Sequence, residues 1–182
     1  MMTTEDRMKF YSVAVLASAV FVSTLHAQQV TRQEVAGVRN FARLETTVAC
    51  AGATGPEAMP ELKKMGFVSV VNLRQATEAG ADVPAGEAAA KAAGLRYHHI
   101  PFNGGAPDPA AADRFLEVMR QAGNQPAFIH CAGGGRAAAM WMIKRLVIDR
   151  WTVERATEEA TALGPPSAPL RNFAIEYAKS HM

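Results

Sequence analysis

The stretch Phe128–Trp141 reads FIHCAGGGRAAAMW and joins an apolar run to an alanine-rich run through three glycines. Glycine loses more backbone freedom on folding than any other residue, so three in succession are costly inside regular structure. The apolar residues before Cys131 predict a short buried strand at 126–130, and those after the glycines predict a helix at 136–149. We therefore expect a strand, a glycine loop and a helix N-terminus, at a place where the backbone itself approaches a ligand.

In the rest of the chain, predicted strands likewise alternate with predicted helices. β-forming runs predict further strands, and segments with proline near their start or glycine at their end predict helices. The expected strands are 46–53, 67–74 and 95–102, and the expected helices are 55–66, 85–94, 108–123, 152–164 and 168–179. This alternation predicts an α/β fold with a mainly parallel central sheet flanked by helices. Ligands of such sheets bind outside the carboxyl ends of the strands, which is where the glycine loop falls.

Length and composition limit the classes of protein to consider. The chain has 182 residues, of which 49% are apolar and 20% are charged, as expected for a globular protein with a core. Its net charge of +2 is too small to indicate binding to nucleic acid or to an acidic membrane. Two cysteines exclude a disulfide scaffold. We expect one domain at 28–182, opening with a polar lead-in at 28–41 that lacks a strong period.

Residues 1–27 have the pattern of a cleaved signal peptide. Arg7 and Lys9 precede an uncharged apolar run at 10–25, and a small residue, Ala27, marks the expected cut. The alternative is an uncleaved anchor, but the apolar run is shorter than the ~20 residues of a spanning helix. We therefore expect a periplasmic or secreted protein that has no membrane attachment after cleavage.

The glycine loop has the residues needed to bind an anion. A helix N-terminus presents unpaired N–H groups and a partial positive charge, and a glycine loop before it can turn further N–H groups inward. The guanidinium of Arg136 can add a planar fork that matches two oxygens of phosphate or sulfate. The same field favours the thiolate of Cys131, which suits in-line attack on phosphorus. The plainer interpretation is a turn with a buried structural cysteine.

These residues resemble a known family. HCAGGGR is similar to the cysteine-phosphatase signature His-Cys-x-x-Gly-x-x-Arg, with one residue fewer between Cys131 and Arg136. Together with GFVSVVNLR, Glu78 and GLRYHHIPF, it resembles the bacterial phosphatase-like family related to the N-terminal part of beta-lactamase-hydrolase-like proteins, from about Ala42 to about Gly164. The resemblance implies a compact dual-specificity-phosphatase-like fold, with Cys131 as nucleophile, a phosphocysteine intermediate and Arg136 as phosphate clamp. The amides implied to line the site belong to Ala132, Gly133, Gly134 and Gly135.

Three further residues have supporting roles in this interpretation. Arg74 and Glu78 match the positions of the family's NLR…E segment and would form a pair that supports the loop. An exposed ion pair of little energetic value is the alternative. His130 would donate hydrogen bonds within the loop and hold the backbone of Cys131, or it is a buried core histidine.

Two departures from the superfamily pattern predict weak or narrow activity. Ala137 stands where classical members carry Ser or Thr to assist loss of the thiolate. The place expected for a general acid, 103–105, holds Asn-Gly-Gly, so the nearest candidates are Asp108 and Asp113. Asp108 also has the sequence context of a helix N-cap. Loss of a positioned acid lowers a rate by about 10²–10⁴-fold.

Several alternatives stay open at this point. The Cys131–Arg136 spacing also fits a rhodanese-like sulfurtransferase, and the missing acid fits a non-catalytic binder of phosphorylated ligands. Cys50 is the other thiol, and either pairs with Cys131 or is a buried hydrophobic residue. We predict no metal cluster and no cofactor. The expected substrate is a phosphorylated small molecule or protein, and the sequence does not indicate an oligomeric state.

Overall fold

The computed structural model describes residues 29–181, so the predicted signal peptide at 1–27 lies outside the described residues. A six-stranded sheet with the order β1-β2-β3-β6-β4-β5 forms the centre of the fold. The strands are β1 (Val30–Arg32), β2 (Ala42–Leu44), β3 (Val48–Ala51), β4 (Ser69–Asn72), β5 (Arg96–His99) and β6 (Ala127–His130). The pairs β3–β6, β6–β4 and β4–β5 are parallel, and β1–β2 and β2–β3 are antiparallel. The predicted α/β fold with a mainly parallel sheet is confirmed.

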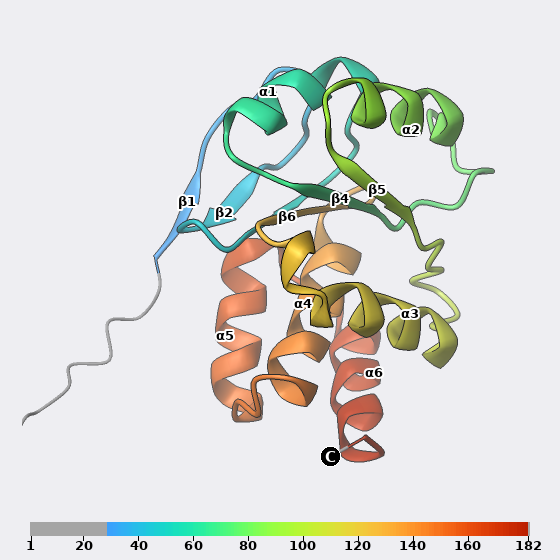
Figure 1. Ribbon diagram of the computed structural model, residues 1–182. Helices are drawn as coiled ribbons and strands as arrows, with labels where there is room; N and C mark the ends of the chain where they lie inside the picture. The colour runs from blue at the N-terminus through green and yellow to red at the C-terminus, as the bar shows by residue number, and fades with distance from the viewer. Residues whose placement is uncertain (1–28, 182) are drawn as a thin grey trace, which may run out of the picture.

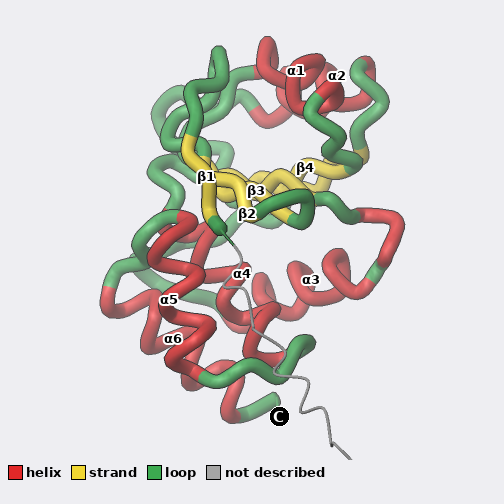
Figure 2. The backbone as a smooth tube through the Cα atoms, turned by 90° about the vertical axis from the view of Figure 1, so that its left-hand side faces the viewer, coloured by secondary structure: helices red, strands yellow, loops and turns green. Residues whose placement is uncertain are grey.

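Helices cover both faces of this sheet, as Figures 1 and 2 show. One face carries α1 (Met59–Lys64), preceded by a 3₁₀ turn at Pro56–Ala58, and α2 (Val83–Ala92). The other face carries α3 (Pro109–Arg120), α4 (Gly135–Val147), α5 (Val153–Leu163) and α6 (Ala168–Lys179), with a second 3₁₀ turn at Ala122–Asn124 after α3. Within the part of the chain that the structure describes, none of these helices has the length and apolar character needed to cross a bilayer.

The core explains why β6 can hold a reactive loop at a fixed place. β6 lies between β3 and β4, and all four of its residues are buried. On one face Phe128 packs against Phe41 and Phe67, with ring centroids 6.2 Å and 5.8 Å away. On the other face α4 is buried over most of its length, which accounts for its apolar residues on nearly every side. The start of α4 is thereby fixed relative to the end of β6.

The polar lead-in at 28–41 contains a short strand that the sequence did not predict. Val30–Arg32 form β1 and pair with β2, with Val30 opposite Leu44. A three-residue edge strand is too short to show an alternating pattern, and two of its three residues are exposed. The loop that follows returns to the sheet, because the N–H of Arg39 donates to the carbonyl of Ala53 at 2.9 Å. The lead-in is therefore part of the folded unit.

The phenylalanine cluster gives a test of the core. Replacing the fully buried Phe128 by alanine removes a ring that contacts two others, and we expect a loss of about 3–5 kcal/mol in the free energy of unfolding. Urea unfolding followed by circular dichroism measures it. Phe173→Ala, at a partly buried ring on the other face of the sheet, is the matched control with a smaller expected loss. Equal losses for the two variants would contradict the prediction that the Phe128 cluster contributes more to stability than Phe173.

Candidate active site

Cys131 follows the last residue of the central strand β6 and is 1% exposed. Its backbone N–H donates to the carbonyl of Ala51 at 3.1 Å, so the loop begins in register with the end of β3. The loop then runs through three glycines into α4, whose first residue is Gly135. The structure thus contains the predicted strand, glycine loop and helix N-terminus at the carboxyl edge of the parallel strands.

The carbonyl groups of this loop are held on its outer side. The carbonyl of Ala132 accepts from the N–H of Ala53 at 3.0 Å, and that of Gly133 accepts from Asn40 Nδ2 at 3.1 Å. In a planar trans peptide the carbonyl and the following N–H point in opposite directions. The N–H of Gly134 accordingly points inward and donates to Cys131 Sγ at 3.1 Å. Successive inward N–H groups form a concave nest suited to an anion.

The three glycines of the loop are under different physical constraints. Gly134 has a φ of 107°, a conformation that L side chains rarely adopt. A Cβ built on Gly135 would lie 3.1 Å from the carbonyl oxygen of Pro165, in the turn before α6. A Cβ on Gly133 would meet no atom within 4 Å. Gly134 is therefore required by backbone geometry and Gly135 by close packing, whereas Gly133 leaves open space in front of the loop.

Arg136 is fixed by four hydrogen-bond acceptors, one of which is the carbonyl of Leu73 at 3.3 Å from Nη1. Its Nη1 and Nη2 donate to the two carboxylate oxygens of Glu78 at 2.6 Å and 2.8 Å, and Nη1 also donates to the carbonyl of Phe102 at 2.8 Å. Among residues 29–181 these bonds involve Nη1 and Nη2, which leaves the edge formed by Nε and the second Nη2 hydrogen without a bonded oxygen. The pKa of Arg136 is raised, first by hydrogen bonding to Glu78 and further by the Cys131 sulfur. The free edge is a charged fork for two oxygens of a tetrahedral anion.

Glu78 joins Arg136 to Arg74. Arg74 Nε donates to Glu78 Oε2 at 3.4 Å, and its other nitrogens donate to the carbonyls of Ala79 and Gly80. The Arg74 and Glu78 side chains are 7% and 20% exposed, so the pair is not the exposed ion pair that was the alternative. Hydrogen bonding from Arg136, opposed by burial, is the main reason that the pKa of Glu78 is lowered to about 2.

His130 is the last residue of β6, and its ring makes no hydrogen bond within the described part of the chain. It is 3% exposed and stacks on Phe128, and neither ring nitrogen finds a partner among residues 29–181. The hydrogen bonds to the loop that the sequence led us to expect are thus not formed. Burial, and then the charges of Arg74 and Arg136, lower the pKa of His130 to about 3, so its ring is neutral.

The structure separates the two aspartates from the Cys131–Arg136 pair. Asp108 is exposed and caps α3, where its carboxylate accepts from the N–H of Ala110 at 2.9 Å. Asp113 accepts a hydrogen bond from the hydroxyl of Tyr177 on α6. In the described part of the chain, no hydrogen bond or ion pair joins either carboxylate to Cys131 or Arg136. Asp108 therefore occupies the cap position that the sequence also indicated.

The loop at 103–105, where a general acid was sought, does lie against Arg136. A Cβ built on Gly104 would be 3.3 Å from both Cγ and Cδ of Arg136. The side chain of Asn103 turns back on its own loop and accepts from the N–H of Gly105 at 2.9 Å. This segment therefore approaches the aliphatic stem of Arg136 at Gly104, and it contains no carboxyl group.

Cys50 and Cys131 are both free thiols. Cys50 lies on β3 opposite Ile129 of β6, so Cys131 is its diagonal neighbour on the same face. No disulfide joins the two sulfurs in this structure. Burial, followed by the nearby Cys131 thiol, raises the pKa of Cys50, as expected for a hydrophobic core position.

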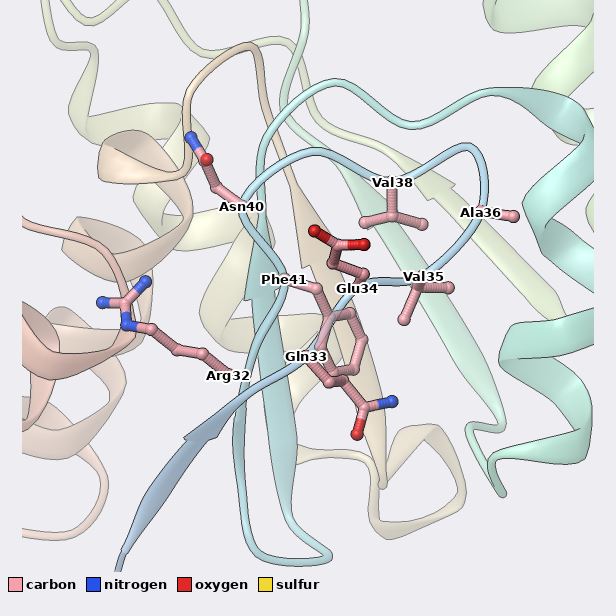
Figure 3. A pocket seen from close by; sticks show the side chains of 8 residues that line it. All are labelled: Arg32, Gln33, Glu34, Val35, Ala36, Val38, Asn40 and Phe41. Atoms are coloured by element: carbon pink, nitrogen blue, oxygen red, sulfur yellow. The ribbon is translucent and has the colours of Figure 1, made fainter.

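Asn40 is a site residue that the sequence analysis missed. It belongs to the segment interpreted as a lead-in, and only the folded structure brings it to Gly133. It also borders a hollow of about 750 Å³ lined by residues of the 32–41 segment, with Val35, Val38 and Phe41 as its apolar part. Figure 3 shows the amide of Asn40 directed away from these side chains. A second hollow of about 390 Å³ lies beside it, between Arg39 and Arg74.

A sulfur at the end of a central parallel strand, inward amides and an arginine at the start of the next helix define the cysteine-phosphatase class of fold. Solved structures of that class are similar to this chain. A DUF442 phosphatase from Shewanella putrefaciens matches with a TM-score of 0.66 and 18% identity, covering 80% of this chain and 95% of that one. TpbA of P. aeruginosa matches with 0.55 and 22%, covering 80% and 90%. The core catalytic domain of the PP-IP phosphatase SIW14 of S. cerevisiae matches with 0.61 and 18%, covering 79% and 88%.

Sequence similarity gives the family. Residues 40–147 match the profile of the beta-lactamase hydrolase-like protein, phosphatase-like domain, and the chain belongs to that family. A beta-lactamase hydrolase-like protein of Agrobacterium fabrum is 33% identical over 103 residues. That match covers 56% of this chain and 24% of the relative, so the chain spans about a quarter of the relative's length.

The lowered pKa of Glu78 predicts how stability depends on pH. Because the folded state holds the carboxylate ionised, its contribution is present above the ordinary pKa of 4.5 and is lost as pH falls towards about 2. Glu78→Gln should therefore be less stable than the wild type at neutral pH, with a difference that shrinks across this interval. Chemical unfolding at several pH values measures it. Glu61→Gln, at an exposed pair, is the control, and a Glu78→Gln difference that is constant with pH would refute the prediction.

The glycine loop predicts unequal effects of alanine at adjacent positions. Gly134→Ala places a side chain at a φ of 107° and should lower the free energy of unfolding by about 1–3 kcal/mol. Gly133→Ala enters open space and should change it by less than about 0.5 kcal/mol. Thermal or urea unfolding compares them. The conclusion that Gly134, and not Gly133, needs to be glycine would be wrong if Gly133→Ala were the more destabilising variant.

Proposed function

We propose that this protein hydrolyses phosphate monoesters through a phosphocysteine intermediate on Cys131. The observation that carries the proposal is the convergence on one sulfur of the Gly134 N–H and the charged side chain of Arg136. Such preorganised donors stabilise charge that develops in a transition state without reorganising at the moment of reaction. The proposal also draws support from the family and from the phosphatases that share this fold.

The reaction follows from the placement of the donors. The loop amides and the free edge of Arg136 hold the non-bridging oxygens of the phosphoryl group, with phosphorus in front of Cys131 Sγ. The thiolate attacks phosphorus in line, so an S–P bond forms while the P–O ester bond breaks and the leaving oxygen takes a proton from solvent. Water then attacks phosphorus, the S–P bond breaks, and inorganic phosphate and the thiolate are released.

The expected activity is weak or confined to substrates with good leaving groups. The segment 103–105 against Arg136 offers no carboxyl group, and Ala137 supplies no hydroxyl after the arginine. A missing general acid lowers the rate by about 10²–10⁴-fold, and the deficit is largest for alkoxides, which are poor leaving groups. Aryl phosphates should therefore be better substrates than alkyl phosphates.

Substrate class and location are further parts of the proposal. A Cys→Ser variant of TpbA was crystallised with phosphotyrosine, which supports an aryl phosphate on a small molecule or a protein as the substrate here. Activity of the tyrosine or dual-specificity type is proposed on the same basis. The signal-peptide pattern at 1–27 supports a periplasmic or secreted location.

The deciding experiment measures phosphate release from an aryl and an alkyl phosphate. The wild type should hydrolyse the aryl ester faster by about 10²–10⁴-fold, and Cys131→Ser should reduce release to background. Rapid quenching should trap phosphate on Cys131. Cys50→Ala, at a buried thiol that the mechanism does not use, should retain turnover. Phosphate release that survives Cys131→Ser would refute the proposal, as would thiocyanate formation from thiosulfate and cyanide without phosphate release.

Asp108 is tested by a separate variant. Asparagine caps a helix as well as aspartate does, so Asp108→Asn preserves the start of α3 while removing the acid. A loss of about 10²–10⁴-fold on alkyl phosphates would assign the leaving-group proton to Asp108. Unchanged rates would restrict Asp108 to its role as a cap.

A further inference from the structure

We propose that Asn40 is a positioning residue of the Cys131 loop: its side-chain amide holds the Gly133 carbonyl outward and so keeps the Gly134 N–H on the sulfur. The inference deepens the proposed function and rests on it for its catalytic consequence. It places a residue of the 32–41 segment, which carries no part of the Cys–Arg signature, in the machinery of the site.

One peptide plane links the Asn40 amide to the sulfur of Cys131. The carbonyl of Gly133 and the N–H of Gly134 belong to the same planar trans unit, so the direction of one sets the direction of the other. Asn40 Nδ2 lies 3.1 Å from the carbonyl oxygen, and Cys131 Sγ lies 3.1 Å from the nitrogen. A rotation of this plane that breaks the first bond also turns the N–H away from the sulfur.

This plane is restrained by Asn40 on its carbonyl and by the isolated bridge that pairs Gly133 with Gly52. The preceding carbonyl, of Ala132, is held by the backbone N–H of Ala53. Across residues 29–181, the Gly133 carbonyl has Asn40 as its one hydrogen-bond donor. Both residues that flank this peptide are glycines, which rotate with little steric resistance. Gly133 also has no atom near its missing Cβ that would resist the motion.

Asn40 is itself held in an unusual conformation. Its φ is 53°, in the left-handed region where asparagine is enriched among non-glycine residues. The adjacent Arg39 is fixed on both sides, because its N–H donates to Ala53 and its carbonyl accepts from Gly52 at 2.7 Å. The Asn40 amide therefore starts from a backbone that is anchored to the end of β3. In Figure 3 this amide points away from Phe41 and Val35 of the neighbouring hollow.

The consequence concerns how readily Cys131 reacts. Asn40 carries no charge, and its amide bonds to the Gly133 carbonyl, not to Arg136 or Cys50. Its removal therefore leaves the charges of the site unchanged. Any change in the reactivity of Cys131 would then report the lost N–H donor. One hydrogen bond to a charged group corresponds to roughly a tenfold change or more.

Asn40→Gly is the decisive variant. Glycine adopts a positive φ more easily than asparagine and lacks the amide, so a purely conformational role predicts unchanged or improved behaviour. We expect instead that alkylation of Cys131 by iodoacetamide, located by mass spectrometry, slows about tenfold. The kcat/KM for an aryl phosphate should fall by a similar factor while the thermal midpoint is retained. Wild-type alkylation and turnover in Asn40→Gly would overturn the proposal.

Two further variants complete the design. Asn40→Asp keeps the size and the left-handed conformation but replaces the donor by an acceptor, so it should show at least the same loss. Glu45→Gly changes another left-handed residue, with a φ of 44° in the turn between β2 and β3, and should leave both rates at their wild-type values. Slow alkylation in Asn40→Gly with no phosphatase activity in the wild type would uphold the positioning role and refute the proposed function.

Discussion

The rest of the site depends on the ion pairs of Glu78, whose carboxylate accepts hydrogen bonds from the guanidinium groups of both Arg136 and Arg74. It joins the segment after β4 to the first turn of α4, two places that are 58 residues apart in sequence. Because the Glu78 carboxylate binds Nη1 and Nη2 of Arg136, it fixes the orientation of the guanidinium and of its remaining edge. Two cations share one carboxylate here, so the site retains a positive charge for an anionic guest.

The loop around Cys131 owes its shape to the sheet. Two backbone hydrogen bonds continue the β3–β6 pairing beyond the strands, from Cys131 to Ala51 and from Ala53 to Ala132. Gly52 and Gly133 form an isolated antiparallel bridge at the next position. The loop is thus an extension of the central strands that bends into α4, which explains how four residues suffice between Cys131 and Arg136. Its donors are in place before a ligand arrives, which is what electrostatic preorganisation requires.

Much of this arrangement could be predicted from local sequence. Apolar runs, helix punctuation and three glycines indicate the strand, the loop and α4, because each depends on residues close together in the chain. β1 could not be predicted, since a three-residue edge strand carries no period. Asn40 was missed because its partner Gly133 is 93 residues away. The family resemblance marked Arg74 and Glu78, yet only the fold shows that Glu78 binds Arg136.

The three loop glycines also show what local sequence cannot predict. Their number in sequence indicates a close approach of the backbone, but not which residue needs to be glycine. Gly135 is constrained by Pro165, which belongs to a turn 30 residues later and which folding brings against the loop. Gly134 is constrained by its own φ, and Gly133 by neither. A pattern that looks uniform in sequence therefore contains three positions with different physical causes.

The absence of a carboxyl group from the loop against Arg136 is consistent with the electrostatics of the site. Glu78 shows what happens to an acid that contacts Arg136, because its pKa falls to about 2 and it holds no proton to donate. The neutral His130 gives the complementary result, since burial and the charges of Arg74 and Arg136 lower its pKa to about 3. The field that favours a bound phosphate thus deprotonates any acid placed beside its guanidinium. A proton for the leaving group has to come from a donor at the distant side of the substrate, or from solvent.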